Sequence, residues 1–495
     1  CINGIFVGRR EENVISYKGI PFVGEQPVGK YRWKAPVYCR PDDGVYEAYY
    51  NAKSSCQNEA YRQKASLYFQ GEDCLYLNIW KAEGESAGKK PVMVWIHGGA
   101  FENGGTADPL YECSNFVREN PDVVAVSIAY RISVFGFFHL SHLPDGKEYQ
   151  DAQNLGLLDQ IKALKWVHEN IAGFGGDPEN VTIWGESAGA GSCTLLSLIG
   201  ASHAYFKRVI AQSGSINLTR STEEAISCTN TLMQALGCST AADLVKVDAE
   251  KLLETATSLL FMHQFPERDG KYLPLDTFEA CANGAMKDID FLIGCNKDEM
   301  NFFVYSFGLE GWDVWVTNRK KGRLAQLPAD EKALVDSFRS DIKGDSYQPD
   351  ASLLSQSWFN APIIRLSENQ TMAGGKAYTY YFTPESPDPI MKCGHAIELA
   401  VVFNHPEMSD DTGRVFDETF SKTMRKMWVQ FAKTGDPSLS AGQSPDGKAK
   451  EWPLYDLTNK MVMVFDEFNI HPEKEAERKI VDWDRTYFLT RYYAL

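Results

Sequence analysis

The segment Gly185-Glu186-Ser187-Ala188-Gly189 has the residue types of a turn that presents a reactive serine. It follows the apolar run Val181–Trp184 and precedes an apolar helical pattern from Cys193 to Ile199. Glycine on either side of the serine permits a tight strand-to-helix turn, because larger side chains would crowd the neighbouring backbone. The start of a helix behind the serine favours developing negative charge. The pattern therefore predicts Ser187 as a nucleophile for acyl transfer.

A serine hydroxyl is a weak nucleophile, so an imidazole must accept its proton and a carboxylate must orient that imidazole. In proteins with this type of turn, the three groups follow one another along the chain in the order serine, acid, histidine. The base is therefore expected after Ser187. The candidates are His203, His263, His395, His405 and His471. His405 and His471 precede prolines that restrict their backbones, whereas His395 lies in a small-residue loop after an apolar run that ends at Phe382. His395 is therefore the predicted base.

The acid is expected on a loop between the nucleophile and the base. Asp298 and Glu299 are adjacent carboxylates directly after the apolar run Phe291–Gly294. Loops that follow strands are where catalytic side chains gather, so this position suits the acid. Spacing alone does not choose between the two carboxylates.

The segment Trp95-Ile96-His97-Gly98-Gly99-Ala100-Phe101 ends another predicted strand. Its small residues allow the backbone N–H groups to approach a substrate oxygen closely, although a plain turn has the same composition. Upstream of the serine turn, the interpretation as an oxyanion-binding loop is favoured. The predicted donors are the N–H groups of Gly99, Ala100 and Ala188, the residue after the nucleophile.

The elements that must position these residues are short buried strands separated by helices. Runs of β-branched and aromatic residues predict strands at Val92–Ile96, Val123–Tyr130, Val181–Trp184, Arg208–Gln212, Phe291–Gly294 and Ala377–Phe382. Apolar residues from Leu157 to Ile171 recur at steps of three and four, which indicates a helix, and the run Gly173–Pro178 ends it. The order strand, helix, strand predicts a mostly parallel sheet flanked by helices, the α/β class.

One domain over residues 1–495 is expected, because no internal repeat and no long Pro/Ser-rich linker divides the chain. The spans from about Ser221 to Phe261 and from Leu309 to Ser357 are polar and helical in pattern, and they interrupt the series of strands. Insertions of this kind are typical of cap elements above a sheet.

The overall composition argues against several classes of partner. With 50 Lys+Arg against 66 Asp+Glu the net charge is -16, which repels nucleic acid and anionic lipid. The apolar runs are far shorter than the about 20 residues that cross a bilayer, so a soluble protein is expected. The chain begins at Cys1 without an initiator methionine, and the sequence leaves the compartment, cytoplasmic or secreted, and the oligomeric state open. No CxxC pair or His-Glu-x-x-His run is present, so neither a metal nor a cofactor is expected.

Several further motifs complete a resemblance that extends over nearly the whole chain. They are Lys18–Phe22 (KGIPF), Glu72–Asn78 (EDCLYLN), Asn154–Gln160 (NLGLLDQ) and Phe431–Pro437 (FAKTGDP). With the serine turn, they make the chain similar to type-B carboxylesterases, the family that also includes cholinesterases, para-nitrobenzyl esterases and neuroligins. The resemblance implies the α/β-hydrolase fold and a serine carboxylesterase acting on a small-molecule ester.

The resemblance also implies roles that spacing leaves open. The Asn-Lys-Asp-Glu motif of the family uses its second carboxylate, so the implied triad is Ser187, Glu299 and His395. A disulfide between Cys56 and Cys74 is implied, and a second between Cys228 and Cys238. Ala100 replaces a third glycine that many members have, and Met300 replaces the usual glycine after the acid.

The kind of ester is less constrained than the reaction. Cholinesterases of this family hold the quaternary ammonium against a tryptophan in the loop between the first cysteine pair; this loop has none and offers Tyr61, Tyr68 and Phe69. We therefore expect uncharged small or medium esters. A lipase or a feruloyl-type esterase is the alternative among enzymes. A non-catalytic adhesion or scaffold protein of the same fold is the alternative from another class.

Overall fold

The computed structural model describes residues 1–57, 69–84, 88–260, 262–408 and 413–492. The chain divides into a first unit, residues 1–207 and 219–277, and a second unit, residues 208–218 and 278–495. Each unit contains part of the strand and helix series predicted from the sequence. The prediction of one domain over 1–495 stays a prediction.

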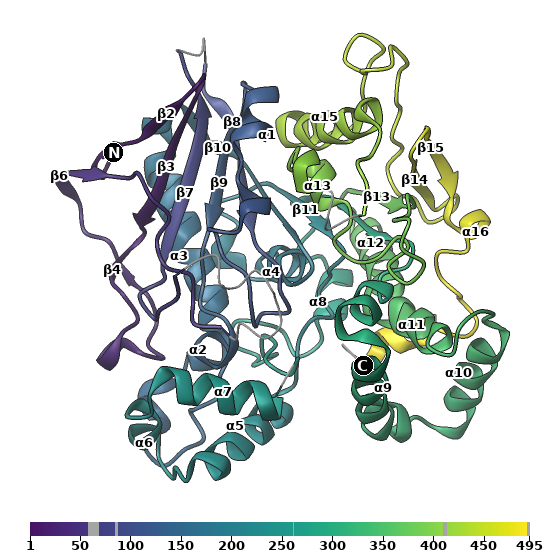
Figure 1. Cartoon of the computed structure of the whole chain (residues 1–495), viewed down its shortest axis with the longest axis horizontal. Helices are drawn as coiled ribbons and strands as arrows, with labels where there is room; N and C mark the ends of the chain where they lie inside the picture. The colour runs from purple at the N-terminus through teal and green to yellow at the C-terminus, as the bar shows by residue number, and fades with distance from the viewer. Residues whose placement is uncertain (58–68, 85–87, 261, 409–412, 493–495) are drawn as a thin grey trace. The chain divides into compact units, whose positions relative to one another are not determined.

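The sheet of the first unit follows the order β10-β8-β9-β7-β3-β2 (Figure 1). Its strands are β10 (Gly176–Glu186), β8 (Lys90–Ile96), β9 (Val124–Ile128), β7 (Tyr76–Ala82), β3 (Val14–Pro21) and β2 (Arg9–Glu11). The first three are parallel and the last three are antiparallel. β8 and β9 are almost entirely buried and β10 is buried from Val181 to Glu186, as expected for strands with helices packed on them.

Some helices of the first unit pack on these strands, among them α1 (Ser114–Glu119), α3 (Leu155–Asn170) and α4 (Ala188–Leu196). The other principal helices of this unit are α2 (Ser133–Gly136), α5 (Thr222–Leu236), α6 (Ala241–Val245) and α7 (Ala249–Leu260). α3 confirms the helix predicted from spacing, and a left-handed glycine, Gly175 with φ 84°, follows the short 3-10 turn after it. α3 and α4 both pack against β10, whose end carries the predicted nucleophile.

The first predicted insertion, residues 221–261, is helical over α5, α6 and α7 (Figure 1). α5 begins at a capping box, in which Ser221 and Glu224 satisfy each other's backbone N–H groups, and ends at Gly237 with φ 66°. Leu232 of α5 and Leu252 of α7 share one buried apolar cluster. The same cluster includes Trp33 and Leu155, so the insertion packs both on itself and on the rest of the first unit.

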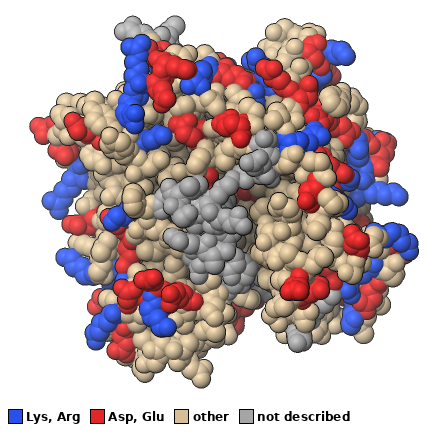
Figure 2. Space-filling view, in the orientation of Figure 1, with Lys and Arg blue, Asp and Glu red and all other residues tan. Residues whose placement is uncertain are grey.

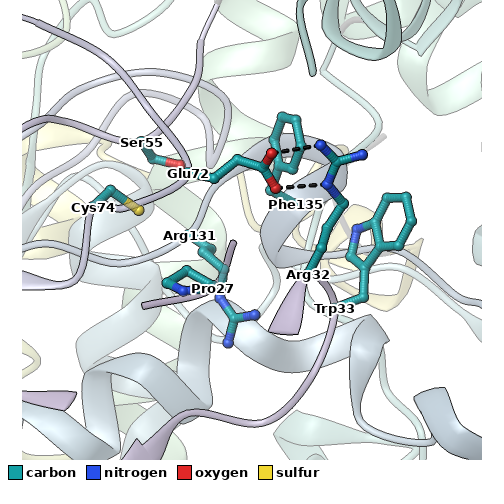
Figure 3. A pocket seen from close by; sticks show the side chains of 8 residues that line it. All are labelled: Pro27, Arg32, Trp33, Ser55, Glu72, Cys74, Arg131 and Phe135. Atoms are coloured by element: carbon teal, nitrogen blue, oxygen red, sulfur yellow. Dashed lines mark hydrogen bonds and ion pairs between the residues drawn. The ribbon is translucent and has the colours of Figure 1, made fainter. Parts of the chain in front are cut away.

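Two ion pairs, one buried and one largely buried, stabilise the loops of the first unit. The Arg32 Nε donates to Glu72 at 2.6 Å, and the two paired side chains both line a small cavity (Figure 3). Arg131 Nε donates to Asp159 at 2.7 Å. Cys74 lines the same cavity as Arg32, Glu72 and Arg131. Because these charges are paired and hydrogen-bonded, their burial is tolerated.

All eleven cysteines are free thiols, so the disulfides implied for Cys56 with Cys74 and for Cys228 with Cys238 are absent. Burial raises the pKa of the Cys56 thiol to about 11 and that of Cys74 well above its ordinary value. Burial likewise raises the pKa of Cys228 and Cys238. Since the thiolate is the form that enters disulfide exchange, these shifts disfavour that reaction.

The sheet of the second unit follows the order β15-β14-β13-β12-β11. Its strands are β11 (Arg208–Gln212), β12 (Asp290–Asn296), β13 (Ala377–Phe382), β14 (Met461–Asp466) and β15 (Asn469–Lys474). β11 to β14 are parallel and β15 is antiparallel. All six strands predicted from the sequence are confirmed, as β8 to β13.

The second unit is rich in helices (Figure 1). Its principal helices are α8 (Thr277–Ala282, whose first residue belongs to the first unit), α9 (Asn301–Lys321), α10 (Ala329–Asp341), α11 (Gln348–Ser355), α12 (Ala361–Met372), α13 (Leu399–Val402), α15 (Glu418–Thr434) and α16 (Glu475–Arg478). The predicted insertion at 309–357 falls on α9 to α11, and α9 is kinked at Gly308 with φ 68°. α12 packs on β12 and β13, while Trp428 of α15 lies 5.3 Å from the ring of Tyr380 on β13.

Two small two-stranded sheets lie outside these strand series. β1 (Asn3–Val7) pairs with β6 (Asp42–Glu47), and β4 (Val23–Glu25) pairs with β5 (Val37–Tyr38). On the face shown in Figure 2, acidic and basic side chains are interspersed over the surface. Among the described residues, no helix is both long enough and apolar enough to cross a membrane.

Candidate active site

Ser187 stands between β10 and α4 in a conformation that serine rarely adopts. Its φ is 57° and its ψ is −124°, and it is the residue immediately before the first turn of α4. A non-glycine residue with positive φ costs on the order of 1–3 kcal/mol and persists only where its surroundings enforce it. Ser187 is half-buried, whereas Ala188 is buried. The predicted turn is therefore present, and it holds its serine under backbone strain.

The surroundings that enforce this turn are close backbone contacts at two glycines. A Cβ on Gly185 would lie 2.5 Å from the Gly189 carbonyl carbon, and one on Gly189 would lie 2.0 Å from the Ile96 carbonyl oxygen. Real Cβ atoms do not approach backbone atoms this closely, so both positions require glycine. The glycines predicted from the motif are therefore needed because the neighbouring backbone leaves no space for a side chain.

The predicted oxyanion loop lies beside the serine within the first unit. β8 and β10 are parallel neighbours with Ile96 opposite Gly185, so the loops that follow them leave the same edge of the sheet. A Cβ on Gly98 would lie 2.6 Å from the Glu186 carbonyl oxygen and 3.1 Å from the Ser187 Cβ. The backbone at Gly98 thus passes directly against the nucleophile.

The loop is fixed by its own hydrogen bonds. The Gly99 carbonyl accepts from the N–H groups of Glu102 and Asn103, both at 2.9 Å, and Gly99 and Ala100 have φ of 105° and 57°. Tyr130 donates to the His97 carbonyl at 2.7 Å and its ring stacks on the His97 imidazole. The sequence did not predict that Tyr130 supports this loop. Its position at the end of the buried run 123–130 is the signal that could have identified it.

Glu299 and His395 are brought together in the second unit. Glu299 Oε2 lies 2.6 Å from His395 Nδ1, and Glu299 Oε1 accepts from the N–H of Asn296 at 2.8 Å. The two loops are also joined by backbone, since the His395 N–H donates to the Glu299 carbonyl at 3.1 Å. Glu299 is fully buried and His395 nearly so, at 4% exposure. A carboxylate can only accept, so Nδ1 carries the proton and Nε2 of the neutral ring is the basic nitrogen.

Asp298, the alternative acid, makes different contacts. Its Oδ2 lies 3.9 Å from Lys297 Nζ, and its N–H donates to the Cys393 carbonyl at 3.0 Å. Burial raises the pKa of the Asp298 carboxyl, and the nearby Lys297 opposes that shift. Of the two carboxylates that spacing left open, Glu299 is the one that contacts His395.

A polar network and a set of rings hold the Glu299 and His395 loops. Asn296 Nδ2 donates to the Gly394 carbonyl at 3.0 Å and to Glu398 at 2.7 Å. The phenyl ring of Phe359 lies 4.8 Å from the imidazole of His395, with the ring of Phe303 at 5.4 Å. Neither Asn296 nor Glu398 was predicted to take part; the position of Asn296 as the last residue of β12 is the signal that could have found it.

The other candidate histidines have different surroundings. His203 Nε2 lies 2.7 Å from the Ser197 carbonyl, and His405 Nδ1 lies 2.6 Å from Glu407. His471 contacts the Asn469 carbonyl and Glu473. His263 is exposed. Among the five, His395 is the one whose carboxylate partner is buried.

Comparison with known proteins gives one consistent result along the chain. The model of the carboxylesterase family matches residues 1–480. A para-nitrobenzyl esterase of Bacillus subtilis (strain 168) is 35% identical over 493 residues, which cover 95% of each chain. An acetylcholinesterase of Bungarus fasciatus is 29% identical over 501 residues, 92% of this chain and 79% of that one.

The solved structures agree with the sequences. A carboxylesterase of Geobacillus stearothermophilus, determined at pH 6.2, superposes with a TM-score of 0.83 at 33% identity, covering 96% of this chain and 97% of that chain. A thermophilic para-nitrobenzyl esterase superposes with a TM-score of 0.81 at 30% identity and the same coverage. The chain therefore belongs to the carboxylesterase family, as an enzyme of the α/β-hydrolase fold that hydrolyses carboxylic esters.

Proposed function

We propose that ester hydrolysis by this chain proceeds through a covalent acyl-enzyme on Ser187, with His395 as the base and Glu299 as the carboxylate that orients the base. The observation that carries this proposal is the strained turn at Ser187, whose φ of 57° presents a serine between β10 and α4. Strained backbone conformations of non-glycine residues are found preferentially at active sites. The bond of 2.6 Å between Glu299 and His395 supports the other two roles.

The reaction then follows from the chemistry of the three groups. His395 Nε2 takes the proton of Ser187 as its Oγ attacks the ester carbonyl, and returns that proton to the leaving alcohol. Glu299 keeps the proton of the ring on Nδ1 and stabilises the imidazolium that forms. Water, activated by the same imidazole, hydrolyses the acyl-enzyme and restores Ser187.

The negative charge of the tetrahedral intermediate needs preorganised donors. We assign this role to the backbone N–H groups of Gly99, Ala100 and Ala188. Ala188 is the first residue of α4, where backbone N–H groups have no partner within the helix, and the helix dipole favours negative charge. Since backbone groups donate, the methyl of Ala100 in place of a glycine does not remove a donor.

A fluorophosphonate probe tests the nucleophile directly. The wild type should be labelled on Ser187 and lose activity in proportion to labelling, and Ser187→Ala should not be labelled there. A non-catalytic adhesion or scaffold protein of this fold would hydrolyse no ester and would not be labelled on this serine. Activity that survives complete labelling of Ser187 would contradict the proposal.

We propose uncharged esters of small or medium size as substrates. Of the aromatic residues that could hold a cation, Tyr61 and Tyr68 lie outside the described residues, and Phe69 is 88% exposed. A cation over an exposed ring gains only about 0.5–1 kcal/mol, because it stays hydrated. Butyrylcholine and a neutral butyrate ester of similar alcohol size should be compared by kcat/KM at fixed ionic strength. A preference for the choline ester above about tenfold, or roughly 1.4 kcal/mol, would contradict the proposal.

A lipase and a feruloyl-type esterase are the enzymatic alternatives. They differ from the proposed activity in the acyl group that they prefer. A panel of p-nitrophenyl esters with acetyl, butyryl, decanoyl and feruloyl groups separates the three. We expect the highest kcat/KM for acetyl or butyryl, and a maximum at decanoyl or feruloyl would assign the alternative.

A further inference from the structure

A second chain of hydroxyl, imidazole and carboxylate lies in the first unit, apart from Ser187. Ser141 Oγ is 3.1 Å from His139 Nε2, and His139 Nδ1 is 2.8 Å from Glu267 Oε2. The hydroxyl and the imidazole come from the loop after α2, and the carboxylate comes from the segment after α7. The three groups have the order that activates a serine in hydrolases, in which the two ring nitrogens face the acid and the hydroxyl.

The hydrogen bonds fix where the protons lie. Because a carboxylate only accepts, His139 Nδ1 carries a proton and donates it to Glu267. Nε2 of the neutral imidazole is then an acceptor, and the Ser141 hydroxyl donates to it. In this arrangement the imidazole is ready to take the serine proton.

The carboxylate and the imidazole are held in place from several sides. Glu267 Oε1 accepts from the Thr222 hydroxyl at 2.6 Å, and the Glu267 N–H donates to Asn154 at 2.8 Å. The Thr229 hydroxyl donates to the His139 carbonyl at 2.8 Å. Two of these bonds come from α5 and one from Asn154, and together they fix the Glu267 carboxylate and the backbone of both residues.

The three groups differ in their exposure to solvent. Glu267 is 1% exposed and His139 is 7% exposed, whereas Ser141 is half-buried. Burial of the acid strengthens its interaction with the imidazole, because water screens it less. The hydroxyl is the member that a small electrophile can reach.

We propose that Ser141 is a second acylation site, which reacts with small activated esters and also with fluorophosphonates, whose P–F bond breaks as the O–P bond forms, so that fluoride leaves with the serine proton. In the step with an ester, Ser141 Oγ forms a bond to the acyl carbon while its proton passes to His139 Nε2. The bond from the acyl carbon to the leaving oxygen breaks, and that oxygen leaves as the alcohol or phenol with the proton from His139. The product is an O-acyl-Ser141, and no further reactant is needed.

The expected rate follows from the contribution of a positioned base. General-base catalysis contributes about 10²–10⁴-fold, so Ser141 should react at least tenfold faster than an exposed serine without an imidazole. Ser340 is such a serine in this molecule: it is exposed, and its hydroxyl donates to the Ser337 carbonyl at 2.8 Å. Ser141 should therefore be labelled first once Ser187 is removed.

The experiment uses the full chain with Ser187→Ala, so that reaction at the proposed esterase nucleophile cannot contribute. The protein is incubated with p-nitrophenyl acetate or with a fluorophosphonate, and adducts are located and timed by peptide mass spectrometry. We expect one dominant adduct on Ser141, its loss in Ser187→Ala/Ser141→Ala, and at least a tenfold slower reaction when His139→Gln is added.

Glu267→Gln is the second variant, because His139→Gln alters a buried site that can affect folding. It keeps the size of the side chain and removes the charge that favours the imidazolium, so it should also slow labelling of Ser141 at least tenfold, and its Tm is measured to show that the variant is folded. Labelling of Ser141 at the rate of Ser340, or at a rate that neither variant changes, would overturn the proposal. Neither outcome bears on Ser187, because that serine is absent throughout.

Discussion

The turn at Ser187 and the loops at Glu299 and His395 are held by different physical means. At the turn the constraint is steric, because a Cβ on Gly185 or Gly189 would meet backbone atoms at 2.5 and 2.0 Å. At the loops the constraint is polar, because Glu299 is fixed by bonds of 2.8 Å from the Asn296 N–H and 2.6 Å from His395. In the first region, tightly packed backbone leaves no space for a side chain. In the second, buried polar groups form hydrogen bonds with each other.

The difference predicts two kinds of failure. Adding atoms to the turn forces the backbone apart, so the main effect is a loss of stability and not of kcat. Exchanging a polar group in the loops changes proton positions within nearly the same volume, which reduces activity while the fold persists. Measuring stability and turnover together on matched variants can therefore break or sharpen the comparison.

The largest expected effect is on turnover in Ser187→Ala. Loss of the hydroxyl removes the covalent route, so kcat for a p-nitrophenyl butyrate substrate should fall by about 10⁵-fold or more. The Tm should be unchanged or slightly higher, because the variant removes only one oxygen atom. Near wild-type turnover in a folded variant would contradict the assignment of the nucleophile.

His395→Ala should reduce kcat almost as much, and His405→Ala is its matched control. Both imidazoles are buried and both have a carboxylate at 2.6 Å, but the partner of His405, Glu407, is exposed. His405→Ala should therefore leave kcat within about threefold of the wild type. The reverse ranking of the two variants would show that the base is not His395.

The next effect in size concerns Glu299. Glu299→Gln should lower kcat by about 10⁴-fold, because an amide no longer holds the imidazole proton on Nδ1 or stabilises the imidazolium. Glu299→Asp should retain more activity than Glu299→Gln, since it keeps the charge. Asp298→Asn is the control and should change kcat little, because Asp298 lies next to Lys297. Equal losses in Glu299→Gln and Asp298→Asn would leave the acid unassigned.

Sequence patterns predict the steric region better than the polar one. Glycines around Ser187 and the buried runs that became β8 to β13 are local signals, so the turn and these parallel strands were predicted, whereas the parallel strand β14 was missed. The choice between Asp298 and Glu299 depends on which side chain points to His395, 96 residues away, and no local pattern encodes that direction. The antiparallel strands β2 and β3 were missed, because β2 is exposed throughout and β3 is only partly buried, without an alternating pattern.

The steric side of the comparison is tested by Gly189→Ala. Its Cβ would lie 2.0 Å from the Ile96 carbonyl oxygen, so β8 and α4 must move apart, at a cost of about 3 kcal/mol or more. Gly200→Ala is the control, since Gly200 is exposed and has nothing within 4 Å of its Cβ position. It should change stability by less than about 0.5 kcal/mol. If thermal unfolding gave the same Tm for both variants, the turn would not be sterically fixed.

The smallest effect is the stability change in Asp298→Asn, and its pH dependence has a definite sign. Burial raises the pKa of Asp298 above its ordinary value of 3.8, so between that value and the raised one the folded state holds more protons than the unfolded state. This carboxyl therefore makes folding less favourable as the pH rises through that window, and the cost is complete at neutral pH. Asp298→Asn removes this cost and should raise the Tm at pH 8 by about 1 °C, and the difference from the wild type should shrink toward pH 4.

Asp446→Asn is the control of opposite sign, because the hydrogen bond of 2.7 Å from Lys450 holds the pKa of Asp446 well below its usual range. Its substitution should lower the Tm at pH 8, and a fall in Tm for both variants would show that Asp298 contributes favourable contacts instead of a buried charge.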